Sequence, residues 1–194
     1  MSFYKESLVR WLKEKDFKSN RVLSVGCQED DRRYFKSFEC KEYLTLDKDK
    51  KFKPDIICDI EYEMPTKNIK NPKNNMYLDY FDDIFTLELW EYISDPRFVL
   101  RMIYRLLKKG GCLWISAPFI YPVHEIMEDD MLRYTESFWR KVLPEIGFKI
   151  IEYKTRNWYN QTGYWQSISA DRMRPSKRFR HHNATGHLII CEKI

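Results

Sequence analysis

The sequence predicts an α/β fold in which helices cover both faces of a mainly parallel sheet. Short β-rich runs recur along the 194 residues, several of them end at a glycine or an acid, and helical patterns separate them. Strands that alternate with helices form βαβ units, which place neighbouring strands in parallel. A chain of this length has room for one sizeable core, so we expect residues 1–194 to form a single domain.

The first half of the chain is expected to supply one helix and four strands. Tyr4, Leu8, Trp11 and Leu12 share one helical face, which predicts an amphipathic helix over residues 4–15. The β-rich runs that follow predict strands at residues 21–25, 42–47, 55–60 and 81–87. Residues 62–76 are rich in Pro, Asn and Lys and are expected to form an exposed loop.

The second half begins with a helix start at Asp95 and Pro96, which suit the N-cap and the first helical position. Residues 108–111 (Lys-Lys-Gly-Gly) predict the end of that helix, because cations stabilise the negative end of a helix and glycine readily adopts a left-handed turn. Thr135 predicts the start of another helix, which Pro144 and Gly147 interrupt or end. Strands are expected at residues 112–117, 148–153 and 187–191, with a long loop or lid insertion over residues 157–186 before the last one.

The composition excludes several classes of protein. No run of 18 apolar residues and no secretory leader is present, so we expect a cytoplasmic protein with no membrane partner. The five cysteines are scattered and never spaced C-x-x-C, which argues against a disulfide framework and a metal site. A net charge of +5 permits an anionic partner without requiring one.

Three of the expected strands end in residues suited to binding a nucleoside. Gly26 and Cys27 end the first strand, where a glycine allows close approach of a ligand to the backbone. Asp47 ends the second, where an acid can bind the two hydroxyls of a ribose, and Asp59 ends the third, where it can accept from an adenine amino group. In this order and spacing, the three tips indicate an adenosine-containing cofactor.

That order resembles class I S-adenosylmethionine-dependent methyltransferases, in particular the small-molecule branch grouped as methyltransferase type 11. The matching segments are residues 22–27 (VLSVGC), 44–47 (LTLD), 54–60 (PDIICDI), 81–84 (FDDI), 88–96 (ELWEYISDP) and 105–111 (RLLKKGG). Residues 117–124 (APFIYPVH), with Asp130 and residues 133–135 (RYT), resemble a narrower subset often encoded among genes for glycan synthesis. The resemblance covers roughly residues 20–155 and implies a Rossmann-like, doubly wound, seven-stranded sheet with an antiparallel last strand. It also implies S-adenosylmethionine as the cofactor.

Carried over residue by residue, the resemblance implies a cofactor site, an acceptor site and a candidate base. The cofactor residues would be Gly26, Cys27, Asp47, Lys48, Asp59, Ile60 and Glu88. The acceptor would meet Tyr121, Asp130, Arg133 and Tyr134, and His124 would remove its proton, because an imidazole titrates near neutral pH.

Structural explanations stand beside these assignments. Gly26 and Asp59 can serve turns alone, and Glu88 can be a solvated acid at a helix start. Arg133 can form a structural ion pair, and His124 can be a hydrogen-bonded loop residue. Methyl transfer also proceeds by in-line placement without any base.

The first loop departs from the family pattern of acid-x-Gly-x-Gly-x-Gly. Ser24 stands in place of the acid, two glycines are missing, and Glu29 and Asp30 could supply the negative charge or crowd the methionine end. Tyr92 stands where a histidine is commoner. These departures keep open a catalytically silent protein that serves as a scaffold or partner subunit.

The expected reaction is methyl transfer to oxygen or nitrogen of a small-molecule or sugar-type acceptor, phosphorylated or not. Basic and aromatic residues interleave over residues 158–182, which suits a phosphorylated acceptor, a solvated surface loop or an RNA substrate. RNA is the less favoured acceptor, because the net charge is modest and no RNA-binding domain is appended. The oligomeric state is not predicted.

Overall fold

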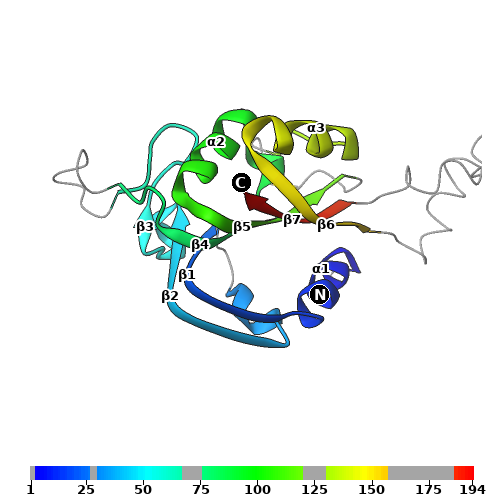
Figure 1. Cartoon of the computed structure of the whole chain (residues 1–194), viewed down its shortest axis with the longest axis horizontal. Coiled ribbons are helices and arrows are strands. Elements are labelled where there is room, and N and C mark those ends of the chain that lie inside the picture. The colour runs from blue at the N-terminus through cyan, green and yellow to red at the C-terminus, as the bar shows by residue number, and fades with distance from the viewer. Residues whose placement is uncertain (1–2, 27–29, 67–75, 120–129, 157–185) are drawn as a thin grey trace, which may run out of the picture.

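The computed structural model describes residues 3–26, 30–66, 76–119, 130–156 and 186–194 (Figure 1). Within them lies a seven-stranded sheet with strand order β3-β2-β1-β4-β5-β7-β6. Strand β7 runs antiparallel to both of its neighbours, and the other pairs are parallel. The strands are β1 (Asp16–Val25), β2 (Ser37–Asp47), β3 (Ile56–Ile57), β4 (Phe81–Leu87), β5 (Leu107–Pro118), β6 (Phe148–Arg156) and β7 (Gly186–Lys193). The predicted Rossmann-like sheet with an antiparallel last strand is confirmed.

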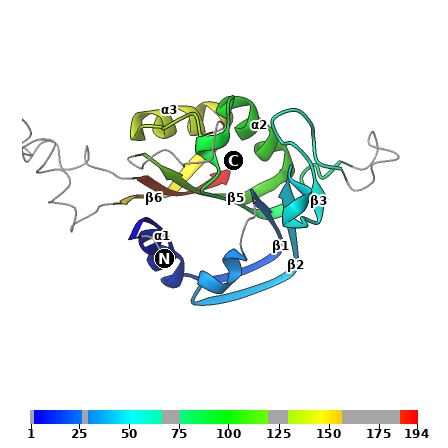
Figure 2. The same ribbon diagram turned by 180° about the vertical axis from the view of Figure 1, so that it is seen from behind.

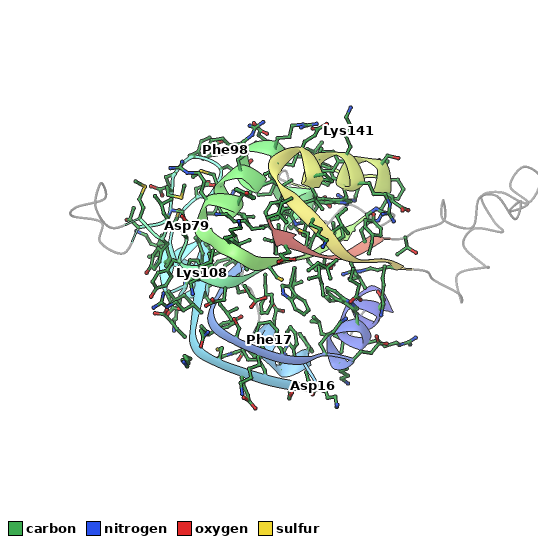
Figure 3. The ribbon with its side chains drawn as sticks, in the orientation of Figure 1. Asp16, Phe17, Asp79, Phe98, Lys108 and Lys141 are labelled. Carbon is green, nitrogen blue, oxygen red and sulfur yellow. The ribbon has the colours of Figure 1, made fainter. Side chains whose placement is uncertain are left out.

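Helices lie on both faces of the sheet, as expected. Helices α2 (Pro96–Leu106) and α3 (Glu136–Ile146) lie on one face, and α1 (Phe3–Lys13) lies on the other, as both views show (Figures 1 and 2). The larger hydrophobic core lies under α2 and α3, where Trp90 and Trp139 pack edge to face. A second core lies under α1, and side chains fill the space between that helix and the sheet (Figure 3).

The second core is unusually aromatic because no α-helix joins β1 to β2 in the described part of this connection. A short 3-10 helix, Asp31–Tyr34, stands there instead. Phe35 follows it and stacks on Phe85 of β4, and Phe17 of β1 packs edge to face on Trp114 of β5. Large rings therefore cover a part of the sheet where an α-helix would otherwise supply the apolar surface.

The predicted helix starts are confirmed by their hydrogen bonds. The Asp95 carboxylate accepts from the Phe98 amide, 3.0 Å away, with Pro96 at the first position of α2, and Thr135 Oγ1 caps α3 at the Phe138 amide. Gly147 ends α3 with a φ of 114°, a left-handed conformation that favours glycine.

The predicted end of α2 at residues 108–111 is wrong. Helix α2 ends at Leu106, and residues 107–111 begin β5 beside a register irregularity in β4. Lys108 extends to Asp82 of β4, with 2.6 Å between Nζ and Oδ1, and Gly110 has a φ of 77°. A lysine and glycine cluster serves an irregular strand start as well as a helix end. Among the described residues, no helix has the length and hydropathy needed to cross a membrane.

Candidate cofactor and acceptor site

The carboxyl edge of the sheet gathers most of the residues that the sequence singles out. Strands β1 to β6 all end at this edge, and the antiparallel β7 begins there. Backbone hydrogen bonds join adjacent tips: Gly26 donates to Leu46, Cys58 to Asp47, and Glu88 to Ser116, at 2.9–3.1 Å. In open α/β sheets ligands bind at this edge.

Gly26 occupies a position that only glycine fits without strain. Its φ is 75°, and a Cβ atom there would lie 2.8 Å from Cδ1 of Leu89, which follows β4. The tip of β1 is thus packed against the segment that leaves β4. Leu89, the residue after Glu88, therefore lies against the tip of the first expected cofactor strand.

Asp47 is half-buried at the tip of β2 and is held in a tight turn. Its Oδ1 atom accepts from the Asp49 amide at 2.8 Å. Lys48, between them, is exposed. The turn fixes the direction of the Asp47 carboxylate at the edge where a ribose would lie.

Asp59 lies beyond the end of β3, which is shorter than predicted and stops at Ile57. Its Oδ1 atom accepts from the Glu61 amide at 3.1 Å, so the carboxylate caps the turn that follows. Ile60 is 4% exposed and belongs to the larger core. Glu61 in turn accepts from the Ser94 amide and hydroxyl, at 2.7 and 2.6 Å, which ties this loop to the residues before α2.

Glu88 is neither a solvated acid nor part of a helix. It has a left-handed φ of 58°, and its carboxylate is held by Arg156, the last residue of β6. Nη2 of Arg156 lies 2.5 Å from Oε1, and Nη1 lies 3.1 Å from Oε2. The Ser116 hydroxyl, on β5, contacts both groups. We call Glu88, Ser116 and Arg156 the polar bridge; sequence reasoning missed its last two members.

Asp130 and Arg133, directly after the undescribed residues 120–129, pair with each other. The contact is bidentate, and the Asp130 side chain is fully buried while that of Arg133 is 20% exposed. The structural ion pair left open by the sequence is therefore present. The ion pair lies against the short 3-10 helix Trp90–Tyr92. The Glu91 carbonyl in that helix accepts from the amides of the two residues after Asp130.

Glu91 is a second charged group that sequence reasoning did not single out. Its residue is 2% exposed, and burial, with the nearby charge of Glu88, raises its pKa to about 8. The carboxyl group therefore carries its proton over much of the neutral range. The sequence offers no signal for Glu91 as a buried acid, except that it follows β4.

Tyr134, expected as an acceptor wall, is 6% exposed and packs on Phe138 and Trp139. Its hydroxyl donates to the Ile93 carbonyl at 3.0 Å. Its own carbonyl accepts from Nε2 of His187, 2.9 Å away. These contacts are those of a core residue.

His187, the second residue of β7, is also buried. The Tyr153 hydroxyl donates to its Nδ1 atom at 2.8 Å, which fixes the neutral ring with its proton on Nε2. Burial lowers the pKa of His187 to about 4. The ring is therefore uncharged at neutral pH and links β6, β7 and the start of α3.

Several of the expected site residues lie outside the described residues. These are Cys27, Tyr121, His124 and the basic stretch within residues 158–182. In the described part of the chain, no three His, Cys, Asp or Glu side chains are grouped to hold a metal ion.

No protein family model and no curated protein sequence matches the chain. Several solved structures are similar to the chain. An S-adenosylmethionine-dependent methyltransferase from Mesorhizobium loti superposes with a TM-score of 0.63 at 14% identity, over 98% of each chain. Phosphoethanolamine N-methyltransferase 2 of Haemonchus contortus, solved with S-adenosyl-L-methionine, gives 0.54 at 13% identity, over 99% of this chain and 53% of that one. The [4+2]-cyclase SpnF gives 0.60 at 14% identity, over 97% of this chain and 80% of that one.

These similarities establish the fold. The chain has the fold of class I S-adenosylmethionine-dependent methyltransferases, and its structural neighbours include enzymes of that class. The cyclase shows that the same fold also carries another reaction.

Proposed function

We propose that the protein is an S-adenosylmethionine-dependent methyltransferase that acts on oxygen or nitrogen of a small-molecule or sugar-type acceptor. One observation carries the proposal: the Asp47 carboxylate is fixed at the tip of β2, beside a left-handed glycine at the tip of β1. In open α/β sheets that bind nucleotides, the glycine turn after the first strand lies against the ligand, and an acid about 20 residues further on binds the ribose.

The residues at the edge fit the cofactor. Asp47 would accept from the ribose hydroxyls and Asp59 would border the adenine, while Ile60, which lies in the larger core, would support that turn from within. Gly26 would supply the left-handed turn at the tip of β1, with Leu89 packed against its α-carbon, and Glu88 would offer a partly exposed carboxylate to the positively charged methionine end. Bound there, S-adenosylmethionine supplies a methyl group activated on a sulfonium ion.

The acceptor assignments remain part of the proposal. Tyr121 and His124 belong to the segment that follows β5, and the Asp130–Arg133 pair closes that segment. A phosphorylated acceptor would be bound by the arginines within residues 172–182, because guanidinium groups bind phosphate in a bidentate manner, whereas Arg133 is already paired with Asp130. A cytoplasmic location accords with the free cysteines Cys40, Cys58, Cys112 and Cys191.

A catalytically silent protein is the competing function. Ser24, which stands where the family has an acid, is 2% exposed and supplies no negative charge to a ligand at the edge. Binding of the cofactor distinguishes the two functions.

Titration calorimetry and thermal unfolding with S-adenosylmethionine and S-adenosylhomocysteine test the proposal. We expect both ligands to raise the unfolding temperature, since a ligand at about 100 times its Kd stabilises the native state by about 2.7 kcal/mol. Asp47→Ala is expected to weaken binding at least tenfold.

Asp49→Ala is the matched control. Asp49 lies in the same turn and caps the next residues through its own carboxylate, but it follows the strand tip. Its removal should change the affinity less than twofold. Equal losses in both variants would show that the ribose site is misplaced, and absence of binding by the unaltered protein would refute the cofactor assignment.

A further inference from the structure

A polar pocket lies at the amino edge of the sheet, opposite the edge where the cofactor is expected. Its volume is about 240 Å³, and it is lined by residues 18–20 of β1, 82–83 of β4 and 108–112 at the start of β5. Lys108, labelled in Figure 3, belongs to it. None of the residues assigned to S-adenosylmethionine lines this pocket, so a ligand there would leave the cofactor site free.

The β5 wall of the pocket is a turn whose backbone the sheet does not use. The ladder with β4 passes from Leu107 directly to Cys112, and the ladder with β7 begins at Cys112. Within the described sheet, residues 108–111 therefore pair with neither strand. Gly110 has a left-handed φ of 77°, and successive amides around such a residue can form a concave site for an anion.

The same turn is closed on one side and open on the other. A Cβ atom at Gly111 would lie 2.9 Å from the carbonyl oxygens of Asp82 and Lys108, so the turn packs directly on β4. At Gly110, which is exposed, the nearest atom to an added Cβ is Oε1 of Glu192, 3.9 Å away and outside the pocket lining. The backbone at Gly110 is therefore accessible to a ligand.

The two acids of the pocket are engaged by groups in its walls. Lys108 Nζ lies 2.6 Å from Oδ1 of Asp82, and the Arg21 amide donates to Oδ2 of the same carboxylate at 3.0 Å. Asp83 accepts from Nε1 of Trp114 at 2.9 Å. Lys108 therefore cancels the charge of Asp82, and Asp83 is the one acid of the lining whose charge faces no lysine in an ion pair among the described residues.

Lys109 and Lys18 give the pocket its surplus of positive charge. Lys109 is exposed and forms no ion pair with any residue that the structure describes. Lys18 lies 3.2 Å from Glu39, but the two side chains are 84% and 68% exposed, so this pair contributes little and can be exchanged for another anion. Ser19 and Asn20 add a hydroxyl and an amide that can donate hydrogen bonds.

We propose that this pocket binds the phosphate group of a small molecule, held by Lys109, Lys18 and the backbone of residues 108–111. A phosphate carries up to two negative charges and several acceptor oxygens, which suits two ammonium groups beside unused backbone amides. The pair of Lys108 with Asp82 stays intact and keeps that carboxylate away from the anion. The proposal does not depend on cofactor binding, because the two sites lie at opposite edges of the sheet.

Titration of the whole chain with inorganic phosphate, followed in amide NMR spectra, tests the proposal. Chloride at equal ionic strength is the reference, because salt screens every exposed charge. We expect saturable shifts at residues 18–20 and 108–112, and no comparable shifts at the carboxyl edge.

Two variants in the pocket should change the affinity for phosphate in opposite directions. Lys109→Gln is expected to weaken binding about fivefold, and Asp83→Asn to strengthen it about threefold, because a nearby carboxylate repels the anion. Asparagine keeps an oxygen that can accept from Trp114. Lys141→Gln is the matched control, since it removes an exposed lysine from α3, away from the pocket (Figure 3), and should leave the affinity within about twofold.

Lys18→Gln is the second weakening variant and serves if Asp83→Asn does not fold, because the Lys18 side chain is exposed. Saturable shifts at the pocket that weaken in both lysine variants support the proposal. Shifts that do not saturate, or equal changes in Lys109→Gln and Lys141→Gln, would overturn it, since phosphate would then only screen surface charge. Binding to vesicles that carry phosphatidic acid, but not to free phosphate, would contradict a small-molecule ligand.

Discussion

The two halves of the carboxyl edge are held together in different ways. On the side of β1 to β3, the carboxylates of Asp47 and Asp59 each accept from an amide two residues further along the chain. On the side of β4 to β7, the polar bridge joins residues 68 and 40 positions apart, and His187 contacts a residue 53 positions away. One half is thus organised by local turns and the other by buried long-range polar contacts. We expect the first half to tolerate substitution better than the second.

The largest expected effect comes from the second half. Arg156→Met should lower the free energy of unfolding by about 3 kcal/mol, because it removes the charged hydrogen-bond donor of the partly exposed Glu88 carboxylate and of the buried Ser116 hydroxyl. Urea unfolding measures the loss. Asp59→Asn is the comparison in the first half, where an amide oxygen can still cap the turn, and it should cost less than about 0.5 kcal/mol. Similar losses in both variants would contradict the distinction between the two halves.

A backbone constraint gives the next effect, and it lies in the first half. Gly26→Ala should cost about 2 kcal/mol, from the left-handed φ and the clash with Leu89. Gly110 has nearly the same φ, 77°, but the nearest atom to its added Cβ lies 3.9 Å away. Gly110→Ala should therefore cost only about 1 kcal/mol, the strain without the clash. Equal costs, measured by denaturant unfolding, would mean that Leu89 moves aside freely.

Taken per pH unit, the smallest effect is a dependence of stability on pH in the second half. The raised pKa of Glu91 means that the folded protein holds a proton that the unfolded chain has released between pH 4.5 and about 8. Stability should therefore fall as pH rises through this window, with a slope of at most about 1.4 kcal/mol per pH unit. Glu91→Gln removes the titrating group.

The contribution of Glu91 is the difference between the slopes of stability against pH measured for the unaltered protein and for Glu91→Gln. The comparison is needed because His187 contributes the opposite trend. Its lowered pKa makes stability rise with pH between about 4 and 6.5. His187→Gln isolates that contribution. Parallel pH profiles for the unaltered protein and Glu91→Gln would show that Glu91 is ionised in the folded state.

The sequence predicted what depends on neighbouring residues. The run at residues 81–87 coincides with β4, and Asp95 and Pro96 start α2, because runs of β-forming residues and helix caps are local signals. The prediction for residues 108–111 was wrong because it used a local pattern that helix ends and irregular strands share. Pairing with β4 decides which of the two structures these residues adopt.

The site divides in the same way. Asp47 could be found because an acid at the end of a β-rich run lies at a strand tip, wherever that strand is placed in the sheet. Arg156 could not, because its importance depends on a strand order that brings β6 within reach of β4. Tyr134 was expected near an acceptor from its motif, whereas its burial depends on α3 packing over it.

The antiparallel last strand has a consequence for how such a protein can diversify. Arg156, the last residue of β6, is paired in register with Gly186, the first of β7, so the chain leaves and re-enters the sheet at one point. Whatever joins these two residues can change in length or composition at a small entropic penalty, without shifting either strand. Evolution can therefore vary the residues between these two strands while the sheet itself stays the same.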